Sequence, residues 1–292
     1  MGKPLKEAKD EIKGFYNVVK KLIDIAPGAL EGKVVKQNEH GILKYTREPV
    51  GVVMVISPWN FPVLTCANIL VPSILAGNAV VIKHSPYTPL IAKHFEEAFK
   101  QAGVPNLVND MMIAATDCQA IYEYPEIGYV AFTGSMETGK CVQEDVADSR
   151  FINVGLELGG NDAAYVAEDA DLDLAVTEIV RGALFNAGQC CNSIERVYVH
   201  NSLYDDFLEK ALVEIENYQI GNPMLDSTKL GPLCLPEKPD HLQRQIEDAA
   251  QQGARVLCGG SATTDMAGKG RFYLPTMVAD AQNDMDIMVK LF

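Results

Sequence analysis

The segment from Phe185 to Cys191 carries a candidate nucleophile. An apolar helix is expected to end there and to lead into Gly188, Gln189 and the pair Cys190-Cys191. A thiol lifted out of a packed helix end, where backbone amides lower its pKa, can act as a thiolate nucleophile. Cysteines are also among the most buried residue types and often behave as small hydrophobic side chains. Taken alone, this segment favours the buried structural cysteine.

Two further polar side chains stand at expected strand ends. Glu157 follows an apolar strand and precedes two glycines, and Asn60 lies between two prolines directly after the expected strand 52–56. A carboxylate in such a place can serve as a general base, and two prolines can fix a turn that aims an amide. Solvation of a strand-end glutamate and ordinary turn chemistry explain the same residues equally well.

A third pattern points to a phosphate group. Phe132-Thr133-Gly134-Ser135 closes an expected strand and opens a helix, and Gly139 follows four residues later. Backbone N–H groups and a hydroxyl at a helix start can hold a pyrophosphate. The pattern does not match the GxGxxG fingerprint, and a Gly-Ser pair at a helix start is usually only an N-cap.

These residues need a scaffold, and the hydrophobic pattern predicts an α/β one. Apolar strands separated by amphipathic helices indicate parallel βαβ units with both sheet faces covered, that is, a doubly wound domain in the first half of the chain. A second α/β stretch begins near Gly159. Strands are expected at 52–56, 79–82, 111–114, 128–132, 163–166, 196–199 and 255–258. Helices are expected at 6–25, 63–75, 89–102, from 137, and at 172–185, 204–216 and 240–252. The turn residues 38–41 predict a β-hairpin within 31–48.

Composition narrows the class of protein. The 292 residues are 48% hydrophobic and 22% charged, as in an ordinary globular protein. The formal net charge of −14 argues against a nucleic-acid partner. The most apolar run, 63–77, is too short to cross a membrane, and the first residues form no signal peptide, so we expect no membrane partner and a cytoplasmic location. Seven cysteines without CxxC spacing predict neither a disulfide framework nor a metal site.

In their order and spacing, the motifs resemble those of the aldehyde dehydrogenase superfamily, in particular its succinic-semialdehyde and general aldehyde dehydrogenase branch. The resemblance extends over nearly the whole chain, from Gly2 to Thr276. It implies a Rossmann-like NAD(P)-binding domain at 1–158, an α/β catalytic domain at 159–292 and a hairpin arm at about 31–48 used for homo-oligomerisation. The motifs that carry it are Trp59-Asn60-Phe61-Pro62, Lys83, Phe132-Thr133-Gly134-Ser135, Glu157-Leu158-Gly159-Gly160 and Gly188-Gln189-Cys190-Cys191.

The resemblance also implies a role for each motif. Cys191 is expected to be the nucleophile, Glu157 the general base, and Asn60 the oxyanion donor together with the Cys191 N–H. The implied reaction is NAD(P)-dependent oxidation of a small-molecule aldehyde to a carboxylic acid, through a cysteine thiohemiacetal and a thioester. Residues expected to bind NAD or NADP are Ile56, Trp59, Lys83, Ser85, Thr133, Gly134, Ser135 and Gly139.

The chain departs from the family pattern on the cofactor and substrate sides. Pro86 stands three residues after Lys83, where NAD-preferring members place a glutamate, and Ser85 beside it could donate a hydrogen bond to a 2′-phosphate. We therefore expect NADP to be tolerated. Ala114 and the alanine after it replace a usual glycine. Phe185 stands where succinic-semialdehyde members often carry an arginine, so the sequence does not specify the aldehyde.

The family pattern continues beyond both ends of this chain, and it places an acidic pair where Val289-Lys290-Leu291 stand. We therefore expect a chain that is truncated at both ends, with impaired nicotinamide positioning and uncovered apolar surface. An inactive relative that binds a dinucleotide or a homologous subunit is the alternative function. A cysteine esterase that uses Cys191 and Glu157 without a cofactor is a third interpretation.

Overall fold

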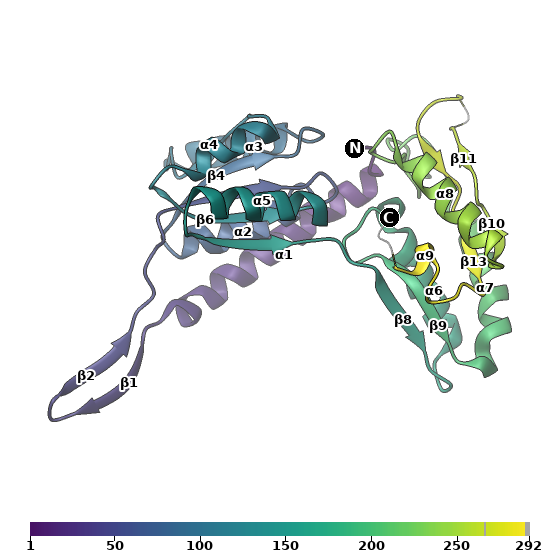
Figure 1. The fold of residues 1–292 in the computed structure, drawn as a ribbon, viewed down its shortest axis with the longest axis horizontal. Coiled ribbons are helices and arrows are strands. Elements are labelled where there is room, and N and C mark those ends of the chain that lie inside the picture. Colours follow the sequence, from purple (N-terminus) through teal and green to yellow (C-terminus); the bar gives the residue numbers. More distant parts are fainter. Residues whose placement is uncertain (266, 290–292) are drawn as a thin grey trace. The chain divides into compact units, whose positions relative to one another are not determined.

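The apolar run after Gly51 forms the central strand of a parallel sheet. The computed structural model describes residues 1–265 and 267–289, and in it five strands pair in the order β5-β4-β3-β6-β7 (Figure 1). All the pairings in this sheet are parallel, as the sequence predicts. The bounds are β3 (Val52–Ser57), β4 (Ala79–His84), β5 (Val108–Asp110), β6 (Ile127–Thr133) and β7 (Asn153–Glu157).

The order of the strands creates a switch point beside β3. The chain moves outward from β3 through β4 to β5, and then returns to place β6 on the other side of β3. In open α/β sheets, ligands bind outside the carboxyl ends of the strands at such a reversal. The ends of β3 and β6 are therefore where a ligand site is expected.

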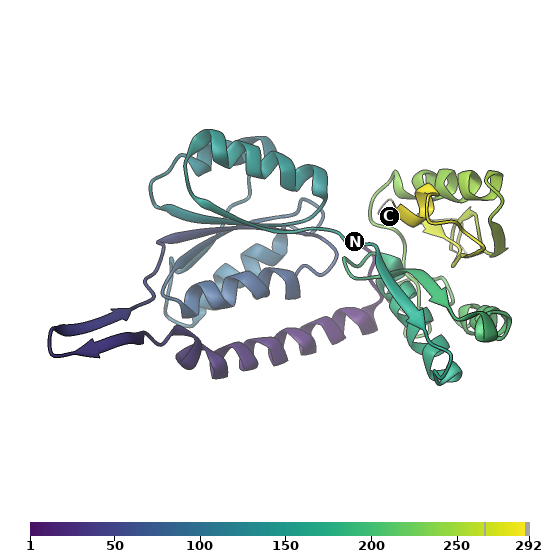
Figure 2. The same ribbon diagram turned by 60° about the horizontal axis from the view of Figure 1, so that its bottom comes forward.

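Helices cover both faces of this sheet, which explains why its strands are apolar throughout. Val53 and Val55 point to one face, where they pack with residues of α2 and α3 and with Phe15 of α1. Met54 and Ile56 point to the other face and pack with residues of α4 and α5. Figure 2 shows helices on both sides of the sheet. The helix bounds are α1 (Leu5–Leu30), α2 (Leu64–Leu75), α3 (Leu90–Gln101), α4 (Cys118–Tyr122) and α5 (Met136–Ser149).

One expected strand is wrong. The segment 111–114 is not a strand; β5 lies three residues earlier, and 111–114 leads into a short 3₁₀ turn, η1 (Ala115–Asp117). The strand pairs Val108 with Val80 and Asp110 with Ile82, and pairing stops where β4 approaches its end. Val108 is fully buried although two polar residues follow it, whereas Met112 is exposed. The apolar stretch 111–114 was therefore a misleading signal.

The hairpin expected within 31–48 is present. Strands β1 (Lys33–Asn38) and β2 (Gly41–Tyr45) pair antiparallel around a tight turn. In both views it projects away from the five-stranded sheet (Figures 1 and 2). Every residue of the two strands is exposed.

The chain divides into two units. The N-terminal unit is Asp10–Leu158, and the C-terminal unit is Met1–Lys9 together with Gly159–Phe292. Residues 1–9 were expected with the first domain, but they pack in the C-terminal unit. The Leu5 N–H donates to the Pro223 carbonyl oxygen at 2.8 Å, and Gly2 lies directly against Pro232.

The C-terminal unit contains a parallel pair of strands backed by two helices. Its first apolar core joins β8 and β9 to α6 and α7, with Val166, Ile179 and Phe207 among its buried members. A second, smaller core joins α8 to β13 and α9, with Ile246, Val278 and Ile287 among its members. The bounds are β8 (Asp162–Val166), α6 (Leu172–Leu184), η2 (Phe185–Gly188), β9 (Ile194–Val199), η3 (Asn201–Leu203), α7 (Tyr204–Glu216), α8 (Lys238–Gln251), β10 (Arg255–Cys258), β11 (Ala262–Thr263), β12 (Phe272–Tyr273), β13 (Met277–Ala279) and α9 (Asp286–Val289).

Within residues 1–265 and 267–289, none of the helices combines the length and apolarity needed to cross a membrane.

Candidate functional site

The register of the parallel sheet brings several predicted site residues to one edge of the N-terminal unit. Ile56 of β3 lies beside Lys83 of β4, and it also pairs with Phe132 of β6. Thr133 at the end of β6 pairs with Glu157 at the end of β7. The expected base and most of the expected cofactor contacts therefore share the carboxyl edge of this sheet, where the strand order reverses.

The turn that carries Asn60 follows β3 at this edge. The Asn60 Oδ1 accepts a hydrogen bond from the Phe61 N–H at 3.0 Å, so the Nδ2 group is the donating side of the amide. Trp59 beside it is half-buried. An amide fixed in this way can donate to an oxyanion, as the sequence predicts for Asn60.

A buried carboxylate from α1 anchors the far end of the same turn. The Glu11 Oε1 accepts hydrogen bonds from the N–H groups of Val63, at 2.8 Å, and Leu64, at 3.1 Å. Glu11 is only 8% exposed. An anion at a helix start satisfies otherwise unpaired N–H groups and interacts favourably with the helix dipole, so Glu11 acts as a cap for α2 supplied by another helix.

A buried histidine ties this turn to the next strand. The His84 Nδ1 accepts from the Ser85 N–H at 2.9 Å, so the proton of the neutral ring lies on Nε2, which donates to the Pro62 carbonyl oxygen at 3.0 Å. Thr88 Oγ1 lies 3.1 Å from the same Nδ1. Burial lowers the pKa of His84, the nearby Lys83 lowers it further, and the Pro62 hydrogen bond and Glu11 act in the opposite direction. His84 is therefore held neutral.

The segment after β6 has the close packing that a dinucleotide cradle needs. A Cβ at Gly134 would lie 2.6 Å from the Phe132 ring, and one at Gly139 would lie 2.6 Å from the Leu158 side chain. Ser135 is the N-cap of α5 and accepts from the Thr138 N–H at 3.3 Å. Glycine at these two positions therefore lets the start of α5 pack directly against Phe132 and Leu158, and the backbone N–H groups of this helix start suit a pyrophosphate.

The residues at the end of β4 and just after it were expected from the sequence to lie on the adenine side of the site. Lys83 and Ser85 are buried, and Pro86 is exposed. Ser85 Oγ accepts from the Tyr87 N–H at 3.3 Å, which fixes the turn and leaves its own O–H as a donor. The chemistry of these side chains fits a phosphate or a ribose hydroxyl.

The candidate nucleophile belongs to the C-terminal unit, where an unusual backbone presents it. After α6, Asn186 (φ 52°, ψ 35°) and Ala187 (φ 56°, ψ 38°) adopt left-handed conformations, and Gly188 follows at φ 74°. The left-handed region costs roughly 1–2 kcal/mol for each residue that has a side chain. Strain of this kind persists only where the surroundings enforce it, and it concentrates at functional sites.

Hydrogen bonds enforce this loop, which we define as the nucleophile loop, residues 185–191. The Asn186 N–H donates to Glu7 Oε2 at 3.1 Å, and its Nδ2 donates to the Gln189 carbonyl oxygen at 3.2 Å. Gln189 Nε2 donates back to the Asn186 carbonyl oxygen at 3.0 Å, and its Oε1 accepts from the Cys234 N–H at 2.8 Å. The loop is therefore bonded at both of its ends.

The two adjacent cysteines differ in their surroundings. The Cys190 thiol is partly buried and donates to Asn192 Oδ1 at 2.7 Å. Burial raises the pKa of Cys190, and a hydrogen bond with the Asn192 backbone opposes this only in part. Cys191 is exposed. The geometry favours Cys191 over Cys190 as the reactive thiol, because a thiolate is the nucleophile and Cys190 is held as the neutral thiol.

Gly160 lets the backbone after β7 lie directly against the main chain of Cys191. A Cβ at Gly160 would lie 2.5 Å from the Cys191 carbonyl oxygen and 2.6 Å from Asp162 Oδ1. The second glycine of the predicted Glu-Leu-Gly-Gly motif is thus required by close backbone packing within the C-terminal unit.

Cys191 lies in the C-terminal unit, whereas Asn60, Glu157 and the expected cofactor contacts lie in the N-terminal unit. The sequence patterns did not single out Glu7, Glu11 or His84. A charged or polar side chain at a helix position that otherwise faces the core is the signal that could have found the two glutamates. Nothing in the local pattern marks His84, because it follows a strand at an ordinary position for a polar residue.

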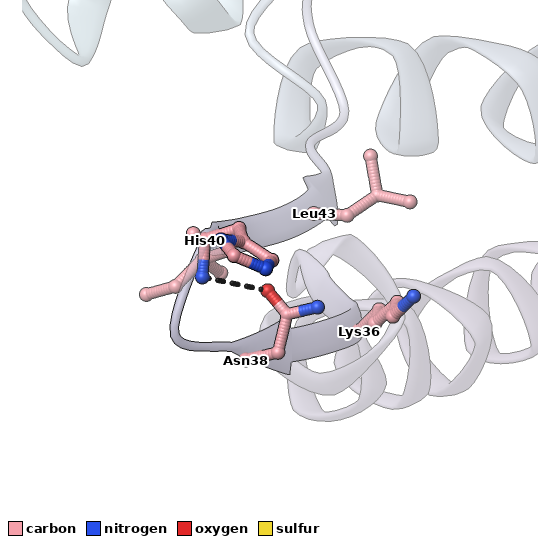
Figure 3. A pocket seen from close by; sticks show the side chains of 6 residues that line it. Lys36, Asn38, His40 and Leu43 are labelled. Carbon is pink, nitrogen blue, oxygen red and sulfur yellow. Dashed lines mark hydrogen bonds between the residues drawn. The ribbon is translucent and has the colours of Figure 1, made fainter.

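A hollow of about 230 Å³ lies elsewhere, on the hairpin (Figure 3). Its lining includes Lys36, Asn38 and His40, and the His40 N–H donates to Asn38 Oδ1 at 3.0 Å (Figure 3). It contains none of the predicted site residues, and it is a groove beside a tight turn rather than a reaction site. Among the residues described, no group of three or more His, Cys, Asp or Glu side chains is arranged to hold a metal ion.

The fold and these motifs define a doubly wound α/β protein. The predicted ligand site lies at the sheet edge where the strand order reverses, and a strained loop carries a thiol. The model of the aldehyde dehydrogenase family matches residues 1–290. The chain therefore belongs to the aldehyde dehydrogenase family, and the family predicted from the sequence is confirmed.

Known relatives are similar over most of the chain. Retinaldehyde dehydrogenase 3 of Mus musculus is 36% identical over 260 residues, which make up 88% of this chain and 50% of that protein. Lactaldehyde dehydrogenase of Escherichia coli is 33% identical with a TM-score of 0.91, and 98% of this chain covers 60% of that structure. Succinic semialdehyde dehydrogenase of Streptococcus pyogenes, in complex with NADP+, is 28% identical with a TM-score of 0.90, at 98% and 62% coverage. The chain spans about half the length of the curated relatives it matches.

Proposed function

We propose that this chain binds NAD or NADP and oxidises an aldehyde to a carboxylic acid, with Cys191 as nucleophile, Glu157 as general base and Asn60 as oxyanion donor. The nucleophile loop is the observation that carries the proposal. It contains three consecutive left-handed residues, 186–188, shortly before the exposed thiol of Cys191, and the neighbouring Cys190 has a raised pKa that disfavours its thiolate. The domain roles follow: cofactor binding in the N-terminal unit and nucleophilic chemistry in the C-terminal unit.

The N-terminal unit fits a dinucleotide at the carboxyl ends of the neighbouring strands β3 and β6. Gly134, Ser135 and the start of α5 would hold the pyrophosphate, and Lys83 would hold a ribose hydroxyl. Ile56, Trp59, Thr133 and Gly139 would shape the pocket, and Ser85 would lie on the adenine side. The close contacts of Gly134 with Phe132 and of Gly139 with Leu158 support this, because a side chain at either glycine would push the start of α5 away from the sheet.

The first half of the reaction forms a carbon–sulfur bond. The Cys191 thiolate attacks the aldehyde carbon, and the carbonyl π electrons move to oxygen. The Asn60 Nδ2 group and the Cys191 N–H donate hydrogen bonds to this oxyanion, and donors of this kind each contribute roughly 3–4 kcal/mol. Bound NAD or NADP supplies the acceptor for the hydride that leaves the former aldehyde carbon. The oxygen then re-forms a double bond to carbon, which gives a thioester on Cys191.

The second half of the reaction breaks that bond. Glu157 takes a proton from water, and the oxygen of the water attacks the thioester carbon. The carbon–sulfur bond breaks, the electron pair returns to Cys191 as thiolate, and the carboxylic acid leaves. General base catalysis of this type contributes about 10²–10⁴-fold. Glu157 is exposed at the end of β7, so water can reach it.

The substrate is defined only by its reacting group. The names of the relatives mention retinaldehyde, lactaldehyde and succinic semialdehyde, which differ in size and charge and share the aldehyde. We propose a small-molecule aldehyde, because Cys191 and Asn60 act on that group alone.

The test separates the two half-reactions. Purified protein is mixed rapidly with NAD or NADP and an aldehyde, and NAD(P)H is followed by absorbance. Glu157→Gln should keep a stoichiometric burst and lose steady turnover, whereas Cys191→Ser should lose both. Cys190→Ser is the matched control and should keep both. Steady turnover by Cys191→Ser would contradict the proposal, and so would the absence of NAD(P)H in the wild-type protein.

We also propose that the hairpin mediates homo-oligomerisation. Its strands expose Val34, Val35, Ile42 and Leu43, each half exposed or more. An isolated two-stranded hairpin is marginally stable in water, so apolar residues on such an arm are better explained by a second copy that covers them.

A further inference from the structure

The nucleophile loop needs an external support. Asn186, Ala187 and Gly188 are all left-handed, and Asn186 is 1% exposed. A buried backbone N–H without an acceptor is costly, and a strained loop relaxes when its restraints are removed. Its hydrogen bonds at Gln189 come from within the loop and from Cys234, which lies 45 residues further along the chain.

The acceptor for the Asn186 N–H comes from the other end of the chain. Glu7 Oε2 accepts that hydrogen bond at 3.1 Å, across 179 residues of sequence. The N–H lies at the first left-handed residue, so this bond holds the point where the backbone leaves the ordinary helical region. Hydrogen bonds to a charged group are stronger than neutral ones.

Glu7 is itself fixed in place. The N-terminal segment before it is tied to the C-terminal unit by the Leu5 N–H, which donates to the Pro223 carbonyl oxygen at 2.8 Å. Gly2 at φ 98° packs against Pro232 and Gly231, where a side chain on either glycine would clash. The Ala8 N–H donates to the Pro4 carbonyl oxygen at 2.9 Å, and this bond closes the first turn of α1, which contains Glu7.

We propose that Glu7 is a positioning residue that holds the nucleophile loop in the conformation presenting Cys191 and turning Cys190 inward. This inference rests on the proposed role of Cys191. The carboxylate takes no part in the chemistry; it acts through the Asn186 amide. Its loss frees the left-handed turn, so that the two thiols lose their distinct surroundings.

Two readouts test this on the whole chain, and neither requires turnover. Hydrogen exchange is followed by mass spectrometry in peptides that contain residues 186–192, and iodoacetamide labelling gives the ratio of Cys191 to Cys190 modification. Glu7→Ala should speed exchange in these peptides and lower the labelling ratio, each by about tenfold, as expected for the loss of one hydrogen bond to a charged group. Glu7→Gln keeps an acceptor oxygen and should change both in the same direction by less.

Glu209 on α7 is exposed and provides the matched control. Glu209→Ala should match the wild-type protein in both measurements. If Glu7→Ala does not fold by circular dichroism, Glu7→Gln decides. If the Glu7 variants show the same hydrogen-exchange rate and the same labelling ratio as the wild-type protein, Glu7 does not position the nucleophile loop. Preferential labelling of Cys190 in the wild-type protein instead overturns the nucleophile assignment on which the role rests.

Discussion

Gly160 lies directly against the main chain of Cys191, so that a Cβ at Gly160 would lie 2.5 Å from the Cys191 carbonyl oxygen. Real Cβ atoms essentially never come this close to another heavy atom. The glycine is therefore required by its neighbour and not by its own backbone angles, since its φ is not among the positive values. A change at Gly160 reaches the candidate nucleophile through the backbone.

Gly160→Ala should displace the Cys191 carbonyl and destabilise the protein by about 1–3 kcal/mol, the usual cost of overpacking. Iodoacetamide labelling of Cys191 should change with it, because the main chain at that residue must move. Denaturant unfolding and peptide mapping measure the two effects. Gly14→Ala is the control, since nothing lies within 4 Å of a Cβ there and alanine favours a helix. Equal stability of the two variants would contradict this account.

The two adjacent thiols should differ in the pH dependence of their alkylation. Burial raises the pKa of Cys190 above 9.0, so its reactive thiolate stays rare at pH 7–8 and increases only as the pH rises beyond that range. An aldehyde analogue that alkylates thiols should label Cys191 first at pH 7.5, and Cys190 should gain only at higher pH. Peptide mapping at pH 7, 8 and 9 checks this. Dominant labelling of Cys190 at pH 7.5 would show that its thiol is not suppressed.

Pro86 should permit NADP. A glutamate at this position would repel a 2′-phosphate, and Pro86 removes that charge beside the Ser85 hydroxyl. We expect NADPH and NADH to bind with dissociation constants within about tenfold of each other, and Pro86→Glu to weaken NADPH about tenfold or more, as like charges placed together do. Fluorescence titration measures both. Pro89→Glu, three residues further along the chain, is the control and should leave the ratio of the two dissociation constants unchanged.

The hairpin proposal predicts a change of oligomeric state. Val35→Lys should reduce self-association, because it places a charge on the apolar surface that a second copy would cover. Analytical ultracentrifugation at several protein concentrations gives the assembly state. Val213→Lys on α7 changes a residue of similar exposure, 65% against 61%, and should have no effect. A wild-type protein that stays monomeric at every concentration would end the proposal.

The sequence predicted the parts of the fold that have a strong periodic signal. The run 52–56 and the helices around Phe95 and Phe207 are apolar at the expected spacing, and all are found. The strand at 111–114 was wrong because β5 is only three residues long and two of them are polar. Cys191, Glu157 and Asn60 could be proposed as site residues because their motifs are local, and their roles stay predictions.

The supports of the candidate site could not be predicted in the same way. Glu7 and the Asn186 amide are 179 residues apart, and Glu11 reaches Val63 across 52 residues. Such contacts depend on the tertiary structure, and a glutamate on an amphipathic helix is most simply interpreted as solvated. The left-handed conformations of Asn186 and Ala187 were equally hidden, because neither residue type requires them.

His84 should make the stability of the protein depend on pH. Burial, the largest cause, lowers its pKa below the ordinary value of 6.5, and Lys83 adds to this, while the Pro62 carbonyl and the carboxylate of Glu11 oppose it. In the folded protein the neutral ring accepts from the Ser85 N–H, so a proton on Nδ1 would face another donor. The unfolded chain takes up that proton first as the pH falls. The stabilising contribution of His84 is therefore complete above pH 6.5 and is lost below it, toward the lowered pKa of the folded state.

The measurement is the free energy of unfolding in urea between pH 8 and pH 5.5. The wild-type protein should lose stability below pH 6.5 more steeply than His84→Gln, by up to about 1.4 kcal/mol per pH unit, the limit for one proton. His94→Gln, at an exposed position of α3, is the matched control and should retain the wild-type slope. A His84→Gln variant whose stability falls with pH as steeply as that of the wild type would show that His84 is protonated equally in the folded and unfolded chains.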